Sequence, residues 1–272
     1  MQDSSILWLR VAAILYFPGL IVALLSFLRH HPGRFRGALV SFLMGATIHL
    51  VAIVEEALEV GTFPANNFFE AISLLGLALA VLFLLCHWIY RFESLSVLIM
   101  PLVFLMTLTG SAAGGSASWQ IGTMRDAWLT THVVFIMLGY AGLLVTAAVS
   151  VFYLWRERQL KAKILPSGGD AVPPLMILDK IVSQSLAWGF IALTIGLVLG
   201  IIWASNESGA RWIFERRILI AVVTWLIYLV LVFLRVASGW RGRKAAVLAI
   251  AALVFCAITW VFHSGVAAVL RQ

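Results

Sequence analysis

Long uninterrupted apolar runs are the feature that most limits what this chain can fold into. A helix needs about 20 apolar residues to cross the hydrocarbon core of a bilayer, and the sequence contains several runs of that length. The chain of 272 residues is 62% hydrophobic and 11% charged, whereas soluble domains carry about 25% charged residues. The runs are continuous, unlike the alternating strands of a membrane barrel. The sequence therefore predicts an all-α fold, a polytopic membrane helical bundle.

The apolar runs predict about eight transmembrane helices. Their residue ranges are 6–28, 38–59, 69–89, 94–110, 129–155, 183–204, 217–237 and 245–263. The first run is too long for a signal peptide and lacks basic residues before it, so we expect it to remain as a span. Residues 156–182 are basic and then rich in proline and glycine, and they are predicted to form a cytoplasmic linker loop. We expect one membrane domain over residues 1–272.

Basic residues are distributed unequally between the two sets of loops. Of the 19 lysines and arginines, 13 fall in the loops of one face and 6 in those of the other. Because positive charge concentrates in cytoplasmic loops, both termini are predicted to lie outside. The same asymmetry explains the net charge of +7, so the expected partner is the lipid bilayer and not nucleic acid. Neither of the two cysteines, Cys86 and Cys256, indicates redox chemistry, since each lies within an apolar run.

Three of the six histidines are candidate ligands. His49 lies about 15 Å of helix from the outer end of its span, near the middle of the bilayer, where an ionisable group usually faces a partner or a cavity. His132 opens one span in "LTTHVVFIMLGYAG", and His263 closes another in "FCAITWVFHSG". Both are therefore expected at the outer rim at equal depth, which is what a bis-histidine haem site needs. Ordinary interface histidines are the alternative for each residue alone.

Several motifs occur in a recognisable order along the chain. A membrane histidine precedes a "P-x-N-x-x-x-E" loop that ends at Glu70, and a rim histidine precedes "GYA". A tryptophan-rich segment, "WASNESGARWIFE", then precedes "GWRGRKAA" and a final rim histidine. This order resembles the CcsA branch of the haem-handling cytochrome c assembly proteins, a superfamily that includes the YpjD and HemX types. The resemblance covers residues 38 to 265.

The resemblance assigns roles to individual residues. It implies that His132 and His263 are the two axial ligands of a haem iron and that His49 is the first membrane histidine. The outer segments would supply flat walls and cations for the haem propionates. The implied walls are Trp203, Trp212, Phe214, Trp119 and Trp128, and the implied cations are Arg125, Arg211, Arg216 and Arg217. Alternatively, these residues form an aromatic belt with interfacial arginines and bind no ligand.

The chain departs from the family pattern at several positions. The tryptophan-rich motif of the family reads "WAxxxWGxxWxWD" and, after eight further residues, "TW", which is present here as Thr224 and Trp225. Ser208, Phe214 and Glu215 replace two tryptophans and the aspartate of the first part. The second membrane histidine should fall two residues before Arg235, where this chain has Phe233. A single imidazole cannot form a bis-histidine site in the membrane core. These departures make the chain similar also to the YpjD and HemX types.

The resemblance implies three alternative functions. The first is a factor that handles or delivers haem b in cytochrome c assembly at the extracytoplasmic face of a bacterial inner membrane, with a ResB-like partner and apocytochrome c. The second is a HemX-like membrane regulator or scaffold that acts on a haem biosynthesis enzyme. The third is a haem-bearing subunit of a membrane redox complex. No nucleophile or nucleotide-binding motif is present, so we do not expect the chain to be an enzyme by itself.

The charge asymmetry makes a topology prediction. A periplasmically active reporter fused after Lys163 should be inactive, and the same reporter fused at Gln272 should be active, because the basic loops remain in the cytoplasm. Each site is fused once to a reporter that is active in the cytoplasm and once to a reporter that is active outside. The two activities at a site show on which side of the membrane it lies. A Lys163 fusion that is active only in the exterior compartment would contradict this topology.

Overall fold

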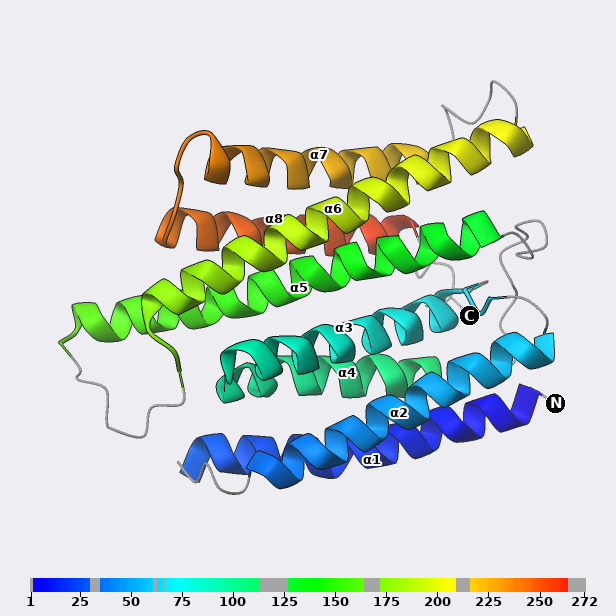
Figure 1. Ribbon diagram of the computed structural model, residues 1–272, viewed down its shortest axis with the longest axis horizontal. Helices are drawn as coiled ribbons and strands as arrows, with labels where there is room; N and C mark the ends of the chain where they lie inside the picture. Colours follow the sequence, from blue (N-terminus) through cyan, green and yellow to red (C-terminus); the bar gives the residue numbers. More distant parts are fainter. Residues whose placement is uncertain are drawn as a thin grey trace. The chain divides into compact units, whose positions relative to one another are not determined.

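The computed structural model describes residues 2–29, 35–60, 63–65, 67–112, 127–163, 172–208 and 216–263. Most of these residues lie in eight α-helices, which Figure 1 labels. They are α1 (Gln2–Arg29), α2 (Phe35–Val60), α3 (Phe68–Tyr90), α4 (Ser96–Gly110), α5 (Ala127–Lys161), α6 (Leu175–Ser208), α7 (Arg216–Val236) and α8 (Arg243–His263), with a 3-10 turn, η2 (Glu93–Leu95), before α4. These described ranges contain no strand. The predicted all-α fold is confirmed.

The helices have the length and composition of membrane spans. Over their described residues, seven spans are long and apolar enough to cross a bilayer: α1, α2, α3, α4 together with η2, α5, α6 and α7. Helix α8 has 21 residues, and at a rise of 1.5 Å per residue it is about 31 Å long, close to the thickness of the hydrocarbon core. Large apolar side chains such as Ile14, Leu28 and Trp188 are about 70% exposed. The protein is therefore an integral membrane protein whose outer surface suits lipid.

Two helices extend beyond the apolar runs that predicted them. Helix α5 continues from the expected end at residue 155 to Lys161, and α6 begins at Leu175 and not at residue 183. Hydropathy marks the part of a helix that suits lipid, whereas the helix itself continues for as long as its residues favour it. Arg156, Glu157 and Arg158 are good helix formers. The predicted linker at residues 156–182 therefore includes one helical end on each side.

The start of α3 has a specific cap. Asn67 has an extended backbone, and its side-chain oxygen accepts a hydrogen bond of 2.9 Å from the Glu70 backbone N–H. The Asn67 amide in turn donates to the Glu70 carboxylate at 2.5 Å. A negative charge in the first turn also interacts favourably with the helix dipole. The acid of the "P-x-N-x-x-x-E" loop thus has a structural role at the beginning of a helix.

The chain divides into two compact units. Unit 1 comprises Met1–Arg125 with Gln159–Pro174, and unit 2 comprises Asp126–Arg158 with Leu175–Gln272. Helices α1 to α4 belong to unit 1, and α5 to α8 make up most of unit 2 (Figure 1). Whether the two units form the single domain expected over residues 1–272 depends on how they associate, so that expectation stays a prediction.

Unit 1 is held together by close packing of small and aromatic residues. Helix α1 packs against α2 and α4, and α3 packs against α4 and α2. The ring of Tyr16 lies directly on Gly45, where a Cβ atom would be 2.7 Å from the ring. Tyr16 also contacts Phe42, which in turn meets Phe83 edge to face. These three aromatic side chains are fully buried, so they form the apolar centre of the unit.

Unit 2 is built on an antiparallel pair, α5 and α6. Thr146 on α5 and Ser185 on α6 join their hydroxyl groups at 2.8 Å. Helix α7 is connected to both helices through Tyr228, whose hydroxyl donates to the Gly139 carbonyl of α5 at 2.7 Å. The Tyr228 ring stacks on Phe190 of α6. Since hydrocarbon cannot satisfy polar groups, these hydrogen bonds are the polar contribution to helix association.

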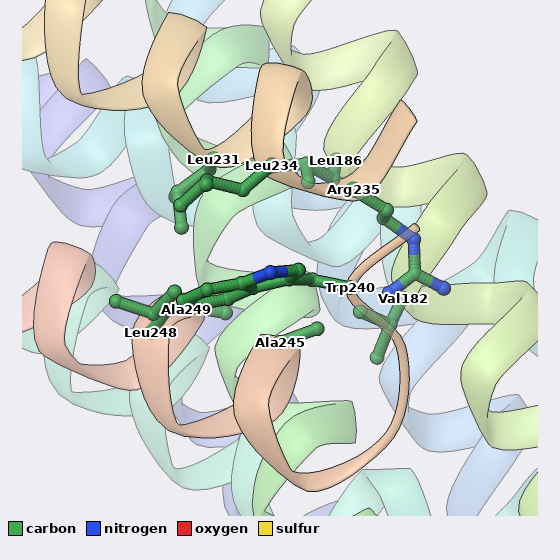
Figure 2. Close-up of a pocket in the computed structure, with 9 residues that line it drawn as sticks. All are labelled: Val182, Leu186, Leu231, Leu234, Arg235, Trp240, Ala245, Leu248 and Ala249. Atoms are coloured by element: carbon green, nitrogen blue, oxygen red, sulfur yellow. The ribbon is translucent and has the colours of Figure 1, made fainter. Parts of the chain in front are cut away.

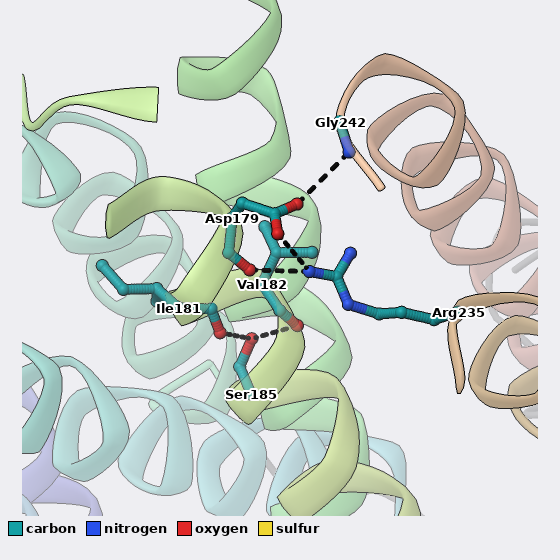
Figure 3. Close-up of polar contacts among 6 residues, drawn as sticks. All are labelled: Asp179, Ile181, Val182, Ser185, Arg235 and Gly242. Atoms are coloured by element: carbon teal, nitrogen blue, oxygen red, sulfur yellow. Dashed lines mark hydrogen bonds and ion pairs between the residues drawn. The ribbon is translucent and has the colours of Figure 1, made fainter. Parts of the chain in front are cut away.

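A partly buried ion pair connects α6, α7 and the turn before α8. The Arg235 guanidinium, which is buried, lies 2.9 Å from the Asp179 carboxylate and 2.8 Å from the Asp179 backbone carbonyl (Figure 3). The same carboxylate accepts a 3.2 Å bond from the Gly242 N–H. Gly242 has a φ of +67°, which glycine adopts without strain. The arrangement fixes the end of unit 2 at which α6 begins and α7 ends.

We predict that breaking this ion pair destabilises unit 2. Asp179→Asn should lower the free energy of unfolding by about 3 kcal/mol, because the buried guanidinium loses its counter-charge. The measurement is SDS-induced unfolding of the purified protein. Combining Asp179→Asn with Arg235→Leu should recover part of the loss, and Arg158→Gln, at an exposed position of α5, is the control. A single Asp179→Asn variant as stable as the wild type would contradict the prediction.

Candidate functional site

The structure describes some of the predicted site residues and not others. The side chains of His49, His132, Trp128 and Trp203 are described. Helix α7 begins with the two arginines of the predicted propionate site, and α8 ends with the second rim histidine, but the side chains of these three residues are outside the described part. The predicted residues that lie outside the described ranges altogether are Trp119, Arg125, Arg211, Trp212 and Phe214.

Four helix ends of unit 2, some of which carry predicted rim residues, lie at one end of the unit. Helix α5 begins, α6 ends, α7 begins and α8 ends at this end of the unit, on the right in Figure 1. His132 lies about 16 Å before Leu143 along α5, and His263 lies about 10 Å beyond Cys256 along α8. Leu143 and Cys256 belong to one buried cluster. The two histidines thus extend from this cluster toward the same end of the unit.

A backbone carbonyl determines the protonation of His132. The ring nitrogen Nδ1 lies 2.6 Å from the carbonyl oxygen of Gly196 on α6. A carbonyl only accepts, so Nδ1 carries the proton and donates it, and Nε2 of the neutral ring keeps its lone pair. Among the described residues Nε2 has no hydrogen-bond partner. Metal-binding histidines have the same arrangement, with one nitrogen on a carbonyl and the other on the metal.

Two tryptophans lie within about two helical turns of His132 and its Gly196 contact, toward the same end. Trp128 precedes His132 by four residues and so lies on the same face of α5. Trp203 follows Gly196 by seven residues and lies on the face of α6 that meets α5. Trp128 is 54% exposed, and Trp203 is partly buried. Both indoles are therefore where the walls of a rim site would be.

Trp225 of the tryptophan-rich motif is an internal residue. Its indole N–H donates to Thr194 of α6 at 2.9 Å, and its ring stacks on Phe190 with centroids 5.8 Å apart. The motif therefore has two physical parts in this chain. Its first residues lie at the end of α6, while its final tryptophan joins α7 to α6 inside unit 2. The spacing of these tryptophans along the sequence did not indicate that one lies at a helix end and the other inside unit 2.

His49 is the centre of a polar cluster in unit 1. It is fully buried on α2, and its Nε2 lies 2.9 Å from the Ser73 hydroxyl of α3. Its Nδ1 lies 3.4 Å from the hydroxyls of Tyr16 on α1 and Thr107 on α4. Both ring nitrogens thus have partners, and those partners come from the three other helices of the unit. A bond from His49 to iron would require one of these contacts to break.

A cavity lies at the end of unit 2 that holds the ion pair. Figure 2 shows its lining, in which Trp240 and Arg235 face apolar side chains of α6, α7 and α8. Its volume is about 10 Å³, which is room for one water molecule, and Arg235 Nη1 is buried with no hydrogen-bond partner in the described structure. The cavity is too small for a porphyrin. It is also separate from the candidate site, because the two lie at opposite ends of unit 2.

Comparison with known proteins identifies the family. The family model described as Cytochrome C assembly protein matches residues 65–266. The chain belongs to the cytochrome c assembly protein family. The matched region contains His132 and His263, whereas His49 precedes it.

Several relatives of the family are similar along most of their length. A "Cytochrome c biogenesis protein CcsA" of Parasynechococcus marenigrum (strain WH8102) is 28% identical over 228 residues, 75% of this chain and 75% of the relative. The CcsA protein of Prochlorococcus marinus (strain MIT 9313) is 27% identical over 230 residues, 74% of this chain and 72% of the relative. That of Synechococcus sp. (strain CC9311) is 27% identical over 252 residues, 80% of this chain and 83% of the relative.

The structure also describes Phe233, where the resemblance leads us to expect a second membrane histidine. Its side chain is 60% exposed on α7. A phenylalanine at such a position suits contact with lipid and is therefore compatible with the surface of unit 2.

We predict that His49 stabilises unit 1. His49→Leu should lower the free energy of unfolding by about 1–3 kcal/mol, because the Ser73 hydroxyl and its neighbours lose a buried partner. The measurement is the unfolding midpoint in SDS. Thr47→Val is the control, since Thr47 is exposed on the same helix and its hydroxyl donates to the carbonyl of Leu43 within that helix. Equal midpoints for His49→Leu and the wild type would show that the cluster contributes nothing.

Proposed function

We propose that this cytochrome c assembly protein binds haem b at the end of unit 2 where α5 begins and α8 ends. His132 and His263 are the axial ligands in this proposal. The bound haem is the cargo of cytochrome c assembly, handled at the extracytoplasmic face of a bacterial cytoplasmic membrane. The observation that carries the proposal is the His132 ring, whose Nδ1 is held by the Gly196 carbonyl while Nε2 has no hydrogen-bond partner among the residues that the structure describes.

Each part of the site supplies a property that haem requires. His132 Nε2 offers a lone pair, and its Nδ1 bond to Gly196 strengthens that ligand by making the imidazole more basic. Trp128 and Trp203 give flat apolar surface beside it. The four predicted arginines would neutralise the two propionates through bidentate contacts. Bound haem iron supplies the redox-active centre that is later delivered to a c-type cytochrome.

The proposal also assigns partners. Covalent attachment of haem to a c-type cytochrome uses thiols of the apocytochrome, and both cysteines of this chain are buried. The chain would therefore present haem while apocytochrome c supplies the reacting thiols, with a ResB-like protein as the membrane partner. Named relatives in cytochrome c biogenesis support this class of function.

The test is the absorption spectrum of the full-length protein, purified in detergent from cells supplied with haem. The wild type should carry haem with a low-spin, six-coordinate spectrum. His132→Ala or His263→Ala should give five-coordinate haem or none, because one axial ligand is lost, and added imidazole should restore part of the low-spin signal. Arg216→Gln and Arg217→Gln should weaken haem retention without changing the ligand field.

Two controls make this test specific. His30→Ala and His31→Ala should leave the spectrum unchanged, since both positions are assigned to the opposite, cytoplasmic side by the charge distribution. A well-folded wild-type protein without haem, unaltered by His132→Ala, would reject the proposed site. The rim would then be an aromatic belt with ordinary interface histidines.

The HemX-like alternative has its own support in the incomplete tryptophan motif and in Phe233. Coexpression separates the two functions. A delivery factor should raise the yield of a haem-stained c-type cytochrome when a ResB-like partner and apocytochrome c are present, and His132→Ala should abolish the increase. A regulator should instead change the level of a haem biosynthesis enzyme and leave the cytochrome yield unchanged.

A further inference from the structure

Gly200 is in closer contact with His132 than any side chain would allow. It lies on α6, one turn after Gly196. A Cβ atom at Gly200 would be 2.5 Å from Cε1 of the His132 ring and 2.7 Å from Nδ1. Real Cβ atoms do not approach other atoms this closely, and an imidazole ring is too rigid to yield at one corner. The ring therefore lies directly on the α6 backbone.

The same contact positions the Nδ1 hydrogen bond. The His132 ring reaches the Gly196 carbonyl at 2.6 Å because nothing projects from Gly200 between the ring and the helix. A methyl group at residue 200 would push the ring away from α6. Nδ1 would then lose its acceptor, and the two neutral tautomers of the ring would no longer be distinguished by that bond.

We propose that Gly200 is a positioning residue for His132. Because Gly200 has no side chain, the imidazole can approach α6 and donate from Nδ1–H to the Gly196 carbonyl. This hydrogen bond fixes the tautomer and leaves the Nε2 lone pair as the ligand. The relevance to haem rests on the proposed function. The tautomer is a property of the chain itself and can be measured without haem.

Packing between α5 and α6 offers a matched control. Gly142, on α5, meets α6 as closely as Gly200 meets the histidine, since a Cβ there would be 2.8 Å from the Cα of Gly189. Gly142→Ala therefore strains the same pair of helices. It acts about 15 Å along α5 from His132 and does not touch the ring. Comparing Gly200→Ala with Gly142→Ala separates positioning of the ligand from general packing.

The first experiment uses haem-free, full-length protein labelled with ¹⁵N-histidine at a pH where imidazole is neutral. The His132 signals are assigned by their absence in His132→Gln. In the wild type, Nδ1 should be protonated and Nε2 unprotonated. Gly200→Ala should give the other tautomer or a mixture, and Gly142→Ala should keep the wild-type pattern. A wild-type ring protonated at Nε2 overturns the inference without any variant.

The second experiment uses the same proteins loaded with haem. Gly200→Ala should weaken haem retention by about 10- to 100-fold, the range found when a partner of a ligating residue is removed. Its low-spin signal should decrease, with partial rescue by imidazole, whereas Gly142→Ala should keep the signal. Equal losses in both variants, or a Gly200→Ala protein identical to the wild type, would overturn the positioning role.

The two experiments fail in different ways. If the wild type binds no haem, the proposed function fails, while the ¹⁵N measurement still decides whether Gly200 sets the His132 tautomer. If the wild type binds haem through His132 but the tautomer is unchanged in a folded Gly200→Ala protein, only the positioning role fails.

Discussion

The structure depends on the cost of leaving a polar group without a partner inside a membrane protein. Hydrocarbon forms no hydrogen bonds. Apolar side chains gain little free energy by moving from lipid to the apolar interior of the protein. Helices in each unit are therefore joined by polar pairs and by close contacts at glycine. In unit 1 the centre of such contacts is His49. In unit 2 they are distributed along α5 and α6, from Thr146 with Ser185 to His132 with Gly196.

The same cost separates the two described histidines of the candidate site. His49 has partners on both ring nitrogens, so its ring is fully used in holding four helices together. Among the described residues His132 has one hydrogen-bond partner, a backbone carbonyl, and that contact determines which nitrogen carries the proton. The same residue type thus has a structural role in unit 1 and, in the proposed function, a ligand role in unit 2. Phe233, where the resemblance places a second membrane histidine, agrees with a structural role for His49.

The family relationship is clear while the motif that distinguishes its members is incomplete. The chain shares 27–28% identity with several CcsA proteins over about three quarters of its length, although only part of the tryptophan pattern is present. The structure explains why one remaining tryptophan need not contact a ligand. Trp225 bonds to Thr194 and stacks on Phe190, and it would stabilise the α6–α7 contact in a protein that binds no haem. Trp203, at the end of α6, is the informative member of the motif.

The sequence by itself determined the helical membrane fold, since apolar runs of this length have only one stable form in lipid. It also predicted which histidines stand at helix ends, because span boundaries follow hydropathy to within a few residues. It could not determine where helices continue past the lipid, as α5 and α6 do, because helix propensity and hydropathy are different properties. Only the tertiary structure decided which nitrogen of His132 donates to a backbone carbonyl and that both nitrogens of His49 have partners. Those facts depend on contacts between residues 64 and 24 positions apart, and such contacts arise only when helices pack.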